Sequence, residues 1–295
     1  MIVSDVRAYT AQGVARIDAR VEWEDCDEAP LDVYVETAEE FGAYVSADPN
    51  ALLVACLLPA WRSGERRVRV SGSLCPELAE RVKTPMGMLS AWFPDDFGPP
   101  PAVEPADGWE TRSAVAGRSV QMLSCGIDSL ATLRWNTSHV PRSHQDAISA
   151  CVYFEIDEDP TPSRARLLEA TGPRVDVVTA VTTEAVVEAI PVRTSLWWLA
   201  DDGHFYTKKW HGAFLAGLLT CFSRRFRRGC VASSHSPSVV QPYGSHPLLD
   251  PYFSSAHFAI EHDLFSMHRN EKIALVAGWP TGVANIRVCQ NENSG

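Results

Sequence analysis

Residues 117–133 read GRSVQMLSCGIDSLATL, and they predict a strand, a tight turn and a helix in succession. The apolar run from Val120 to Leu123 is typical of a short buried strand, and the residues from Asp128 onward favour a helix. Such a turn leaves backbone N–H groups at the positive end of the helix dipole, where a phosphate binds. The stretch therefore predicts a phosphate-binding loop.

The candidate nucleotide-binding residues of this loop follow directly from the turn. Two of them carry hydroxyl donors, and the carboxylate of Asp128 suits an anion site only if a divalent cation such as Mg²⁺ bridges it to the phosphates. The loop is not a Walker A motif, because no lysine follows the glycine, and it is not a GxGxxG fingerprint. An ordinary strand–turn–helix junction is the alternative interpretation. The candidates are Ser124, Cys125, Gly126, Ile127, Asp128 and Ser129, with Asp128 also the expected metal ligand.

The loop resembles the SGGxDS signature of the PP-loop ATP pyrophosphatases, the adenine nucleotide alpha-hydrolase-like superfamily, with Cys125 in place of the first glycine. SSH at 233–235 and PYGSHPLLDPYFSS at 242–255 are similar to a bacterial branch of that superfamily near the deazapurine nitrile synthases. The resemblance implies ATP as cosubstrate and adenylation of a carboxylate or amide oxygen. Members of the branch often carry a cysteine-rich zinc segment where this sequence has Cys289 alone, so that segment lies outside this sequence or is lost.

The composition is that of an ordinary globular protein, with 295 residues, 45% of them hydrophobic and 21% charged. A formal charge of −11 repels polyanions and argues against a broad nucleic-acid surface. No apolar run reaches the roughly 20 residues of a membrane-spanning helix, and the first residues lack a signal-peptide pattern, so a cytoplasmic protein without a membrane partner is expected. The eight cysteines form no CxxC pair, which favours buried free thiols over disulfides or zinc.

The chain is predicted to contain two domains. Residues 1–93 are expected to form a small β-rich domain, with strands at 15–23, 31–37, 51–59 and 66–72 and a helical stretch at 75–93. Residues 94–110 are rich in proline and acidic side chains and are expected to form a linker that holds no regular element. Residues 111–295 are expected to form the PP-loop ATP-binding domain.

The second domain alternates strand and helix, which predicts an α/β fold with a doubly wound parallel sheet of the PP-loop, HUP-like kind. The expected strands are 119–123, 150–156, 175–181 and 230–234, and the expected helices are 128–135, 163–170, a short one from 182 that ends before Pro191, and 210–228, ended by Gly229. Arg224, Arg225, Arg227 and Arg228 would then occupy the last turn of the longest helix. Because parallel sheets gather their ligand-binding loops at the carboxyl ends of the strands, Ser124 and Ser234 are expected at one edge.

Site chemistry is concentrated after residue 232, where five of the nine histidines lie. The loop from Ser233 to Asp250 is expected to close the site opposite the phosphate loop; alternatively, Asp250 merely caps a turn and His246 packs beneath it. Lys272, Arg269 or Lys208 would supply positive charge to the phosphates. The histidines are His235, His246, His257, His262 and His268; the further nucleotide-binding candidates are Ser233, Ser234 and His235; and the catalytic candidates are Asp128, Ser129, His246, Asp250 and Lys272.

The leading functional hypothesis is an ATP-dependent adenylating enzyme of specialised metabolism, which releases AMP and pyrophosphate and activates its substrate for a nitrogen or sulfur nucleophile. A sulfurtransferase with Cys125 or another thiol as persulfide carrier and a nucleotide-binding protein without turnover are the alternatives. The expected partner is a small-molecule or peptide substrate, and a homodimer is compatible with the sequence.

Overall fold

The computed structural model describes residues 1–111 and 116–287, and its strands join in one mixed sheet of ten. The strand order is β10-β9-β6-β7-β8-β3-β2-β1-β4-β5, and six of the nine neighbouring pairs are parallel. The chain is therefore an α/β protein. The strands are β1 Ile2–Ala11, β2 Val14–Glu22, β3 Leu31–Ala38, β4 Arg67–Val70, β5 Ala102–Pro105, β6 Ser119–Met122, β7 Ile148–Ile156, β8 Glu188–Thr194, β9 Arg228–Ala232 and β10 Ala259–Asp263.

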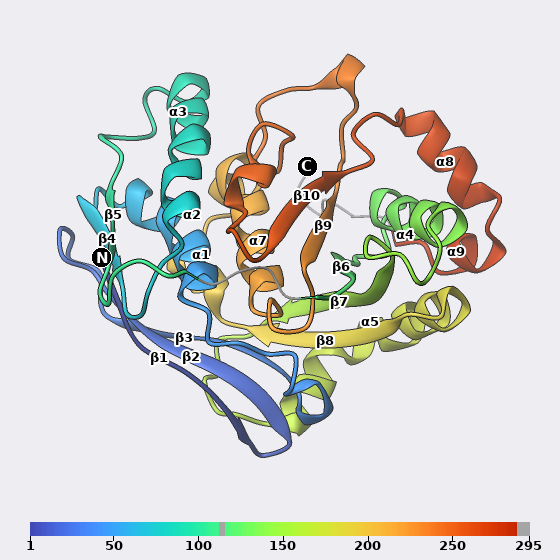
Figure 1. Cartoon of the computed structure of the whole chain (residues 1–295), viewed down its shortest axis with the longest axis horizontal. Coiled ribbons are helices and arrows are strands. Elements are labelled where there is room, and N and C mark those ends of the chain that lie inside the picture. The colour runs from blue at the N-terminus through green and yellow to red at the C-terminus, as the bar shows by residue number, and fades with distance from the viewer. Residues whose placement is uncertain (112–115, 288–295) are drawn as a thin grey trace, which may run out of the picture.

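Helices cover both faces of the parallel part of this sheet (Figure 1). The side chains of β7 alternate, so that Ala150 and Val152 pack with α1 and α7 whereas Cys151 and Tyr153 pack with α4 and α5. Two core layers result, one on each side of the strands. The helices are α1 Pro49–Arg62, α2 Pro76–Arg81, α3 Lys83–Trp92, α4 Ile127–His139, α5 Arg164–Ala185, α6 Gly203–Phe205, α7 His211–Thr220, α8 Arg269–Ala277 and α9 Pro280–Ala284; the shorter turns are η1 Glu39–Phe41, η2 Leu196–Leu199, η3 Tyr206–Trp210 (π-helical), η4 Pro237–Val239 and η5 Asp250–Phe253.

The spatial order of the parallel strands is β8, β7, β6, β9 and β10. From β6 the chain adds β7 and β8 on one side, and it then returns to add β9 and β10 on the other side. In open parallel sheets the crevice at such a reversal point, beyond the carboxyl ends of the two central strands, is where ligands bind. The loops that follow β6 and β9 flank this crevice. The expectation that Ser124 and Ser234 follow the carboxyl ends of strands at one edge is confirmed.

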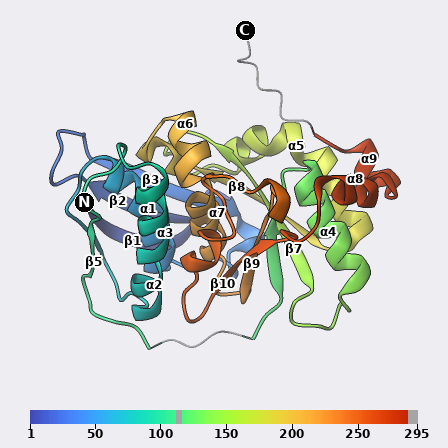
Figure 2. The ribbon, with the colours of Figure 1, turned by 90° about the horizontal axis from the view of Figure 1, so that it is seen from above.

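The N-terminal and C-terminal parts share the sheet, because β3 pairs antiparallel with β8 at Val35↔Thr194, Glu36↔Arg193 and Thr37↔Val192. Figure 2 shows the antiparallel ribbon β1–β3 continuing the sheet beyond β8. The expectation that 94–110 holds no regular element is wrong, since β5 lies there and pairs with β4 at the sheet edge. Proline is compatible with this position because an edge strand leaves one side unpaired.

Residues 51–59 form a helix, α1, and the predicted strand there is wrong. The Asp48 carboxylate caps this helix by accepting a hydrogen bond from the N–H of Asn50 at 3.0 Å, and Pro49 occupies its first turn. Every residue from 50 to 61 is buried. A helix buried on all sides has no polar face, so periodicity cannot distinguish it from a buried strand.

The predicted strand 175–181 is also wrong, because α5 continues through it to Ala185. Its buried residues in this half, Val178, Val181, Thr182 and Ala185, follow helical spacing. The short helix expected before Pro191 is instead β8. Pro191 is tolerated in this strand because the pairing with β3 ends at Val192.

The helix predicted at 210–228 ends at Thr220, and Gly229 lies inside β9 rather than at a helix end. A Cβ at position 229 would lie 3.0–3.1 Å from side-chain atoms of Leu219 and Phe258, so a larger residue there would have to displace them slightly. The arginine cluster therefore does not complement a helix dipole. Instead, Arg227 and Arg228 pair with Asp146, at 2.8 Å and 3.7 Å respectively. The cysteines of the described residues are free, as expected, whereas Cys289 lies outside those residues.

Candidate functional site

The predicted phosphate loop forms a compact turn between β6 and α4. The amide of Gly126 donates to Ser124 Oγ at 3.2 Å, and Ser129 Oγ donates to the carbonyl oxygen of Gly126 at 3.1 Å. The two hydroxyl oxygens lie 3.2 Å apart, so Ser124 donates to Ser129. Two serine side chains thus lie together at the N-terminus of a 13-residue helix, which is where helix geometry favours an anion.

Cys125 adopts a left-handed backbone conformation, with φ of 59°. Glycine adopts this conformation without strain, whereas a residue with a side chain adopts it at a cost. The thiol of Cys125 is fully buried among Leu123, Cys151 and Tyr153, and burial raises its pKa to about 11. The side chain therefore lies in the core beneath the loop.

Asp128 lies in the first turn of α4 and faces α8. Its Oδ2 accepts from Arg269 Nη1 at 2.6 Å, and its Oδ1 lies 3.6 Å from Lys272 Nζ. Oδ1 is buried and has no hydrogen-bond partner within the described structure. Arg269 and Lys272 are one turn apart on α8, so one helix face presents both cations to the loop.

Lys272 is almost fully buried, which is rare for a lysine and requires partners. Its ammonium donates to the carbonyl oxygen of Ser233, at the end of β9, and pairs with Asp128. Burial lowers its pKa, and the carboxylate of Asp128 counteracts part of that shift. Lys272 therefore joins the two loops at the edge of the sheet.

A Mg²⁺ ion fits Asp128 as a single protein ligand. Oδ1 accepts no hydrogen bond but lies 3.6 Å from the Lys272 ammonium; it is a hard oxygen of the kind that Mg²⁺ prefers, and phosphates with water would supply the other ligands of the ion. Within residues 1–111 and 116–287, no three or more His, Cys, Asp or Glu side chains form a metal-binding group.

The second loop starts with Ser233, Ser234 and His235 beyond β9. Ser233 Oγ donates to the carbonyl oxygen of His235 at 2.8 Å, and Ser234 is exposed. Burial lowers the pKa of His235, while the nearby carboxylate of Asp128 opposes this shift. His235 thus lies within electrostatic range of the phosphate loop, and its ring stands edge-on to Tyr243 at 5.3 Å.

A π-helical turn, η3, supports the far side of this second loop. The carbonyl oxygen of Gly244 accepts from Gly212 N–H at 2.7 Å, and Gly244 N–H donates to Thr207 O at 3.1 Å. The same turn carries Lys208, whose ammonium lies 5.9 Å from the centre of the Tyr243 ring. Lys208, Tyr243 and His235 therefore lie together beside the phosphate loop.

Asp250 and His246 are both buried behind that surface. Asp250 accepts from Ser245 Oγ at 2.7 Å and from the amide of His246 at 3.1 Å, as expected for a carboxylate that holds a turn. The His246 ring packs edge-on against Trp92 at 4.8 Å. These contacts favour the structural alternative for both residues, although Asp250 also bonds His262 and through it reaches the site.

Two contributors are not among the residues predicted to bind the nucleotide or to act in catalysis, although His262 is one of the five histidines noted in the sequence. His262 in β10 bridges Asp250 and Ser233, and Gln121 in β6 donates from Nε2 to the carbonyl oxygen of Ser129 at 3.1 Å. Gln121 lies between the apolar residues Val120 and Met122 and is fully buried. A polar amide inside an apolar strand is the sequence feature that could have identified it. The role of His262 depends on a strand pairing that the sequence does not reveal.

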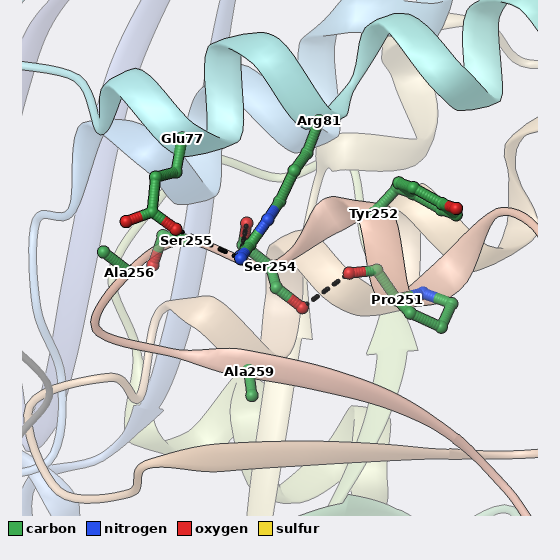
Figure 3. Close-up of a pocket in the computed structure, with 8 residues that line it drawn as sticks. All are labelled: Glu77, Arg81, Pro251, Tyr252, Ser254, Ser255, Ala256 and Ala259. Atoms are coloured by element: carbon green, nitrogen blue, oxygen red, sulfur yellow. Dashed lines mark hydrogen bonds and ion pairs between the residues drawn. The ribbon is translucent and has the colours of Figure 1, made fainter.

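A hollow of about 480 Å³ lies elsewhere, between α2 and the loop after η5 (Figure 3). Arg81 reaches into it but pairs with Glu77 at 3.1 Å and donates to the Ser254 carbonyl oxygen at 3.3 Å. Its lining includes Ala259, the first residue of β10, so it extends toward the amino ends of the parallel strands. The edge with the convergent polar groups is the opposite one.

Comparison of the chain with models of protein families, with curated proteins and with solved structures gave no match in any of the three. Among the helices that the structure describes, none combines the length and apolar character needed to cross a membrane.

Proposed function

We propose that the protein binds Mg·ATP at the crevice between β6 and β9 and transfers AMP to a substrate oxygen, releasing pyrophosphate. The observation that carries the proposal is the meeting, at the reversal point of a parallel sheet, of a serine-lined helix N-terminus with Asp128, Arg269 and Lys272. The strand order, with helices on both faces, supports a doubly wound fold of the PP-loop kind.

In this mechanism a carboxylate or amide oxygen of the substrate attacks the α-phosphorus, and the bond from that phosphorus to the α–β bridging oxygen breaks. Ser124, Ser129 and the amides of the first turn of α4 hold the leaving pyrophosphate, and Arg269 and Lys272 stabilise its charge. Mg²⁺, when bound with the nucleotide, neutralises phosphate charge, and Asp128 Oδ1 would hold it. Lys208, His235 and Tyr243 would contact the substrate, a small molecule or peptide. A cytoplasmic location belongs to the same proposal.

Binding without turnover is the second candidate, because Arg269 already pairs with Asp128 at 2.6 Å and occupies one oxygen of the carboxylate that would hold Mg²⁺. The sulfurtransferase hypothesis gains no support at Cys125, since its thiol is buried with a raised pKa and a protonated thiol is a poor nucleophile.

The test starts with calorimetric titration of the full chain with α,β-methylene-ATP and Mg²⁺, which measures binding without cleavage. ATP is then incubated with the chain and a panel of carboxylic acids, and AMP and pyrophosphate are quantified by ³¹P NMR. Asp128→Ala is expected to abolish pyrophosphate release without unfolding the protein, whereas Asp176→Ala, at an exposed carboxylate of α5, retains it. Binding without products would favour the second candidate, and the absence of binding would overturn both.

A further inference from the structure

Asp250, His262 and Ser233 form a buried chain of hydrogen bonds. His262 Nδ1 lies 2.8 Å from Asp250 Oδ2, and His262 Nε2 lies 2.8 Å from Ser233 Oγ. Serine hydrolases contain the same sequence of groups. Ser233 is fully buried here, however, and its hydroxyl donates to the His235 carbonyl oxygen, so it is not placed to attack a substrate.

The number of hydrogens in this chain determines the protonation of His262. Asp250 accepts from a hydroxyl and from an amide, as an ionised carboxylate does, so the His262 Nδ1 atom carries a hydrogen. Ser233 has one hydroxyl hydrogen, and the His235 carbonyl oxygen, which can only accept, uses it at 2.8 Å. The contact between Ser233 Oγ and His262 Nε2 is then a hydrogen bond only if Nε2 also carries a hydrogen.

The charge of Asp250 leads to the same state. A fully buried carboxylate is strongly unfavourable without a compensating charge. Three other histidine rings interact electrostatically with this hydrogen-bonded group. Burial lowers the pKa of His211 to about 4, and it also lowers the pKa values of His235 and His246. These rings are neutral at pH 7, and the ammonium of Lys272 is directed at the Ser233 carbonyl oxygen and Asp128. Among these groups, His262, whose Nδ1 lies 2.8 Å from Asp250 Oδ2, is the one placed to carry that charge.

We propose that His262 is an imidazolium at neutral pH and acts as a positioning residue, holding Ser233 so that the Ser233 carbonyl oxygen fixes the Lys272 ammonium beside Asp128. The pair Asp250–His262 thus connects the interior of the protein to the phosphate loop. The consequence for nucleotide binding rests on the proposed function, whereas the protonation state does not.

The protonation state is measured on the full chain labelled with ¹⁵N-histidine, by long-range ¹H–¹⁵N NMR at pH 7, with ring signals assigned from single His→Gln variants. Two protonated ring nitrogens are expected for His262, and His211 and His246 provide neutral rings in the same spectrum. A single protonated nitrogen on His262 would overturn the proposal.

The link to Ser233 is tested with Ser233→Ala, which removes the acceptor for the Nε2 hydrogen, and with Ser245→Ala as a matched control. The doubly protonated fraction of His262 at pH 7 should fall in Ser233→Ala and fall less in Ser245→Ala. A merely structural histidine would show no such difference. Equal spectra for the two variants would therefore contradict the hydrogen-bond assignment.

The role toward the nucleotide is tested with His262→Gln, which keeps a neutral donor and loses the charge. We expect the Kd for α,β-methylene-ATP with Mg²⁺ to rise about tenfold, as when the outer partner of a ligand-binding group is lost. An unchanged Kd in a folded variant would overturn the positioning role. If the wild-type chain binds no nucleotide, the proposed function fails while the NMR spectra still decide the protonation state.

Discussion

Cys125 combines an unusual backbone with a buried side chain, and these two features can be separated by substitution. Its φ of 59° disfavours branched side chains, whereas its thiol packs in the core. Cys125→Gly removes the left-handed strain, about 1 kcal/mol, and loses a comparable amount of side-chain burial, so stability should stay within about 1 kcal/mol of the wild type.

Cys125→Val should instead destabilise by about 2 kcal/mol or more, because a β-branched residue fits this φ poorly. Cys151→Val, in the same core layer but on an extended strand, is the matched control and should lose less. Urea unfolding measures all three, and calorimetry with α,β-methylene-ATP should show binding by Cys125→Gly at least as tight as by the wild type. Equal losses for both valine variants would refute the backbone argument.

His211 gives the stability a defined pH dependence. Burial lowers its pKa to about 4, and its Nδ1 is buried without a hydrogen-bond partner in the described structure. Between pH 6.5 and pH 4 the unfolded chain binds a proton at this ring that the folded chain does not, so stability is lost as the pH falls through this range. His211→Phe should reduce that loss by about 1–3 kcal/mol, with the residue's partial exposure taken into account.

The measurement is urea unfolding at several pH values between 4 and 7 for both proteins. His204→Gln, at an exposed histidine of α6, is the control and should leave the pH dependence unchanged. A His211→Phe variant with the wild-type slope would show that this ring is not the titrating group.

Among the elements, the π-helical turn η3 depends on a single glycine of the opposite loop. A Cβ at Gly244 would lie 2.8 Å from Lys209 N, 2.9 Å from His211 N and 2.9 Å from Thr207 O, and none of these backbone atoms can move independently. Gly244→Ala should therefore destabilise by about 2 kcal/mol or more and should weaken nucleotide binding by displacing the second loop.

Gly87→Ala in α3 is the matched control for this substitution. No heavy atom lies within 4 Å of a Cβ built there, so the alanine should stabilise the helix by about 0.5–1 kcal/mol. Thermal unfolding compares the two variants. Similar melting temperatures for both would mean that the loop can move away from η3.

The elements that could be predicted from the sequence are those with a periodic pattern or a clear turn. β2, β3, β4, β6, β7 and β9 were predicted, and so was the start of α4 with its phosphate loop. The sequence does not reveal α1 as a helix because it is apolar on every face. The second half of α5 has the valine-rich pattern of a strand, but tertiary packing overrides this local propensity and the segment is helical. At the site, Asp128 and Lys272 could be selected by residue type. The bridging role of His262 could not, because it depends on the pairing of β9 with β10.

At the scale of the whole molecule, a buried ion cluster holds the two halves of the sheet together. Glu36 of β3 pairs with Arg16 of β2 and with Arg193 of β8, each at 2.8 Å, and Glu36 and Arg193 are fully buried. Glu36→Gln removes the carboxylate that the two guanidinium groups share, while Arg16 keeps Asp18 and Arg193 keeps Asp157 as a second partner. The substitution should therefore destabilise the protein by about 1–3 kcal/mol.

Glu40→Gln is the matched control, because it makes the same charge change in the exposed pair with Arg164 and should alter stability by less than about 1 kcal/mol. Urea unfolding is followed by tryptophan fluorescence and by circular dichroism. Since β3 and β8 share one seam, a single transition with coincident probes is expected for the wild type. Two separated transitions would instead support two independently folding domains.

The same seam has a consequence during synthesis of the chain on the ribosome. β3, which ends at Ala38, can pair with β8 only after the ribosome has synthesised the chain as far as Thr194. At a translation rate of roughly 5–20 residues per second, this delay lasts about 8 to 30 seconds. Throughout that time the nascent β3 exposes an unpaired edge to the crowded cell, and such an edge invites pairing with other chains. A chaperone that shields the first 40 residues would therefore be expected to increase the yield of folded protein, and slowing translation should decrease it.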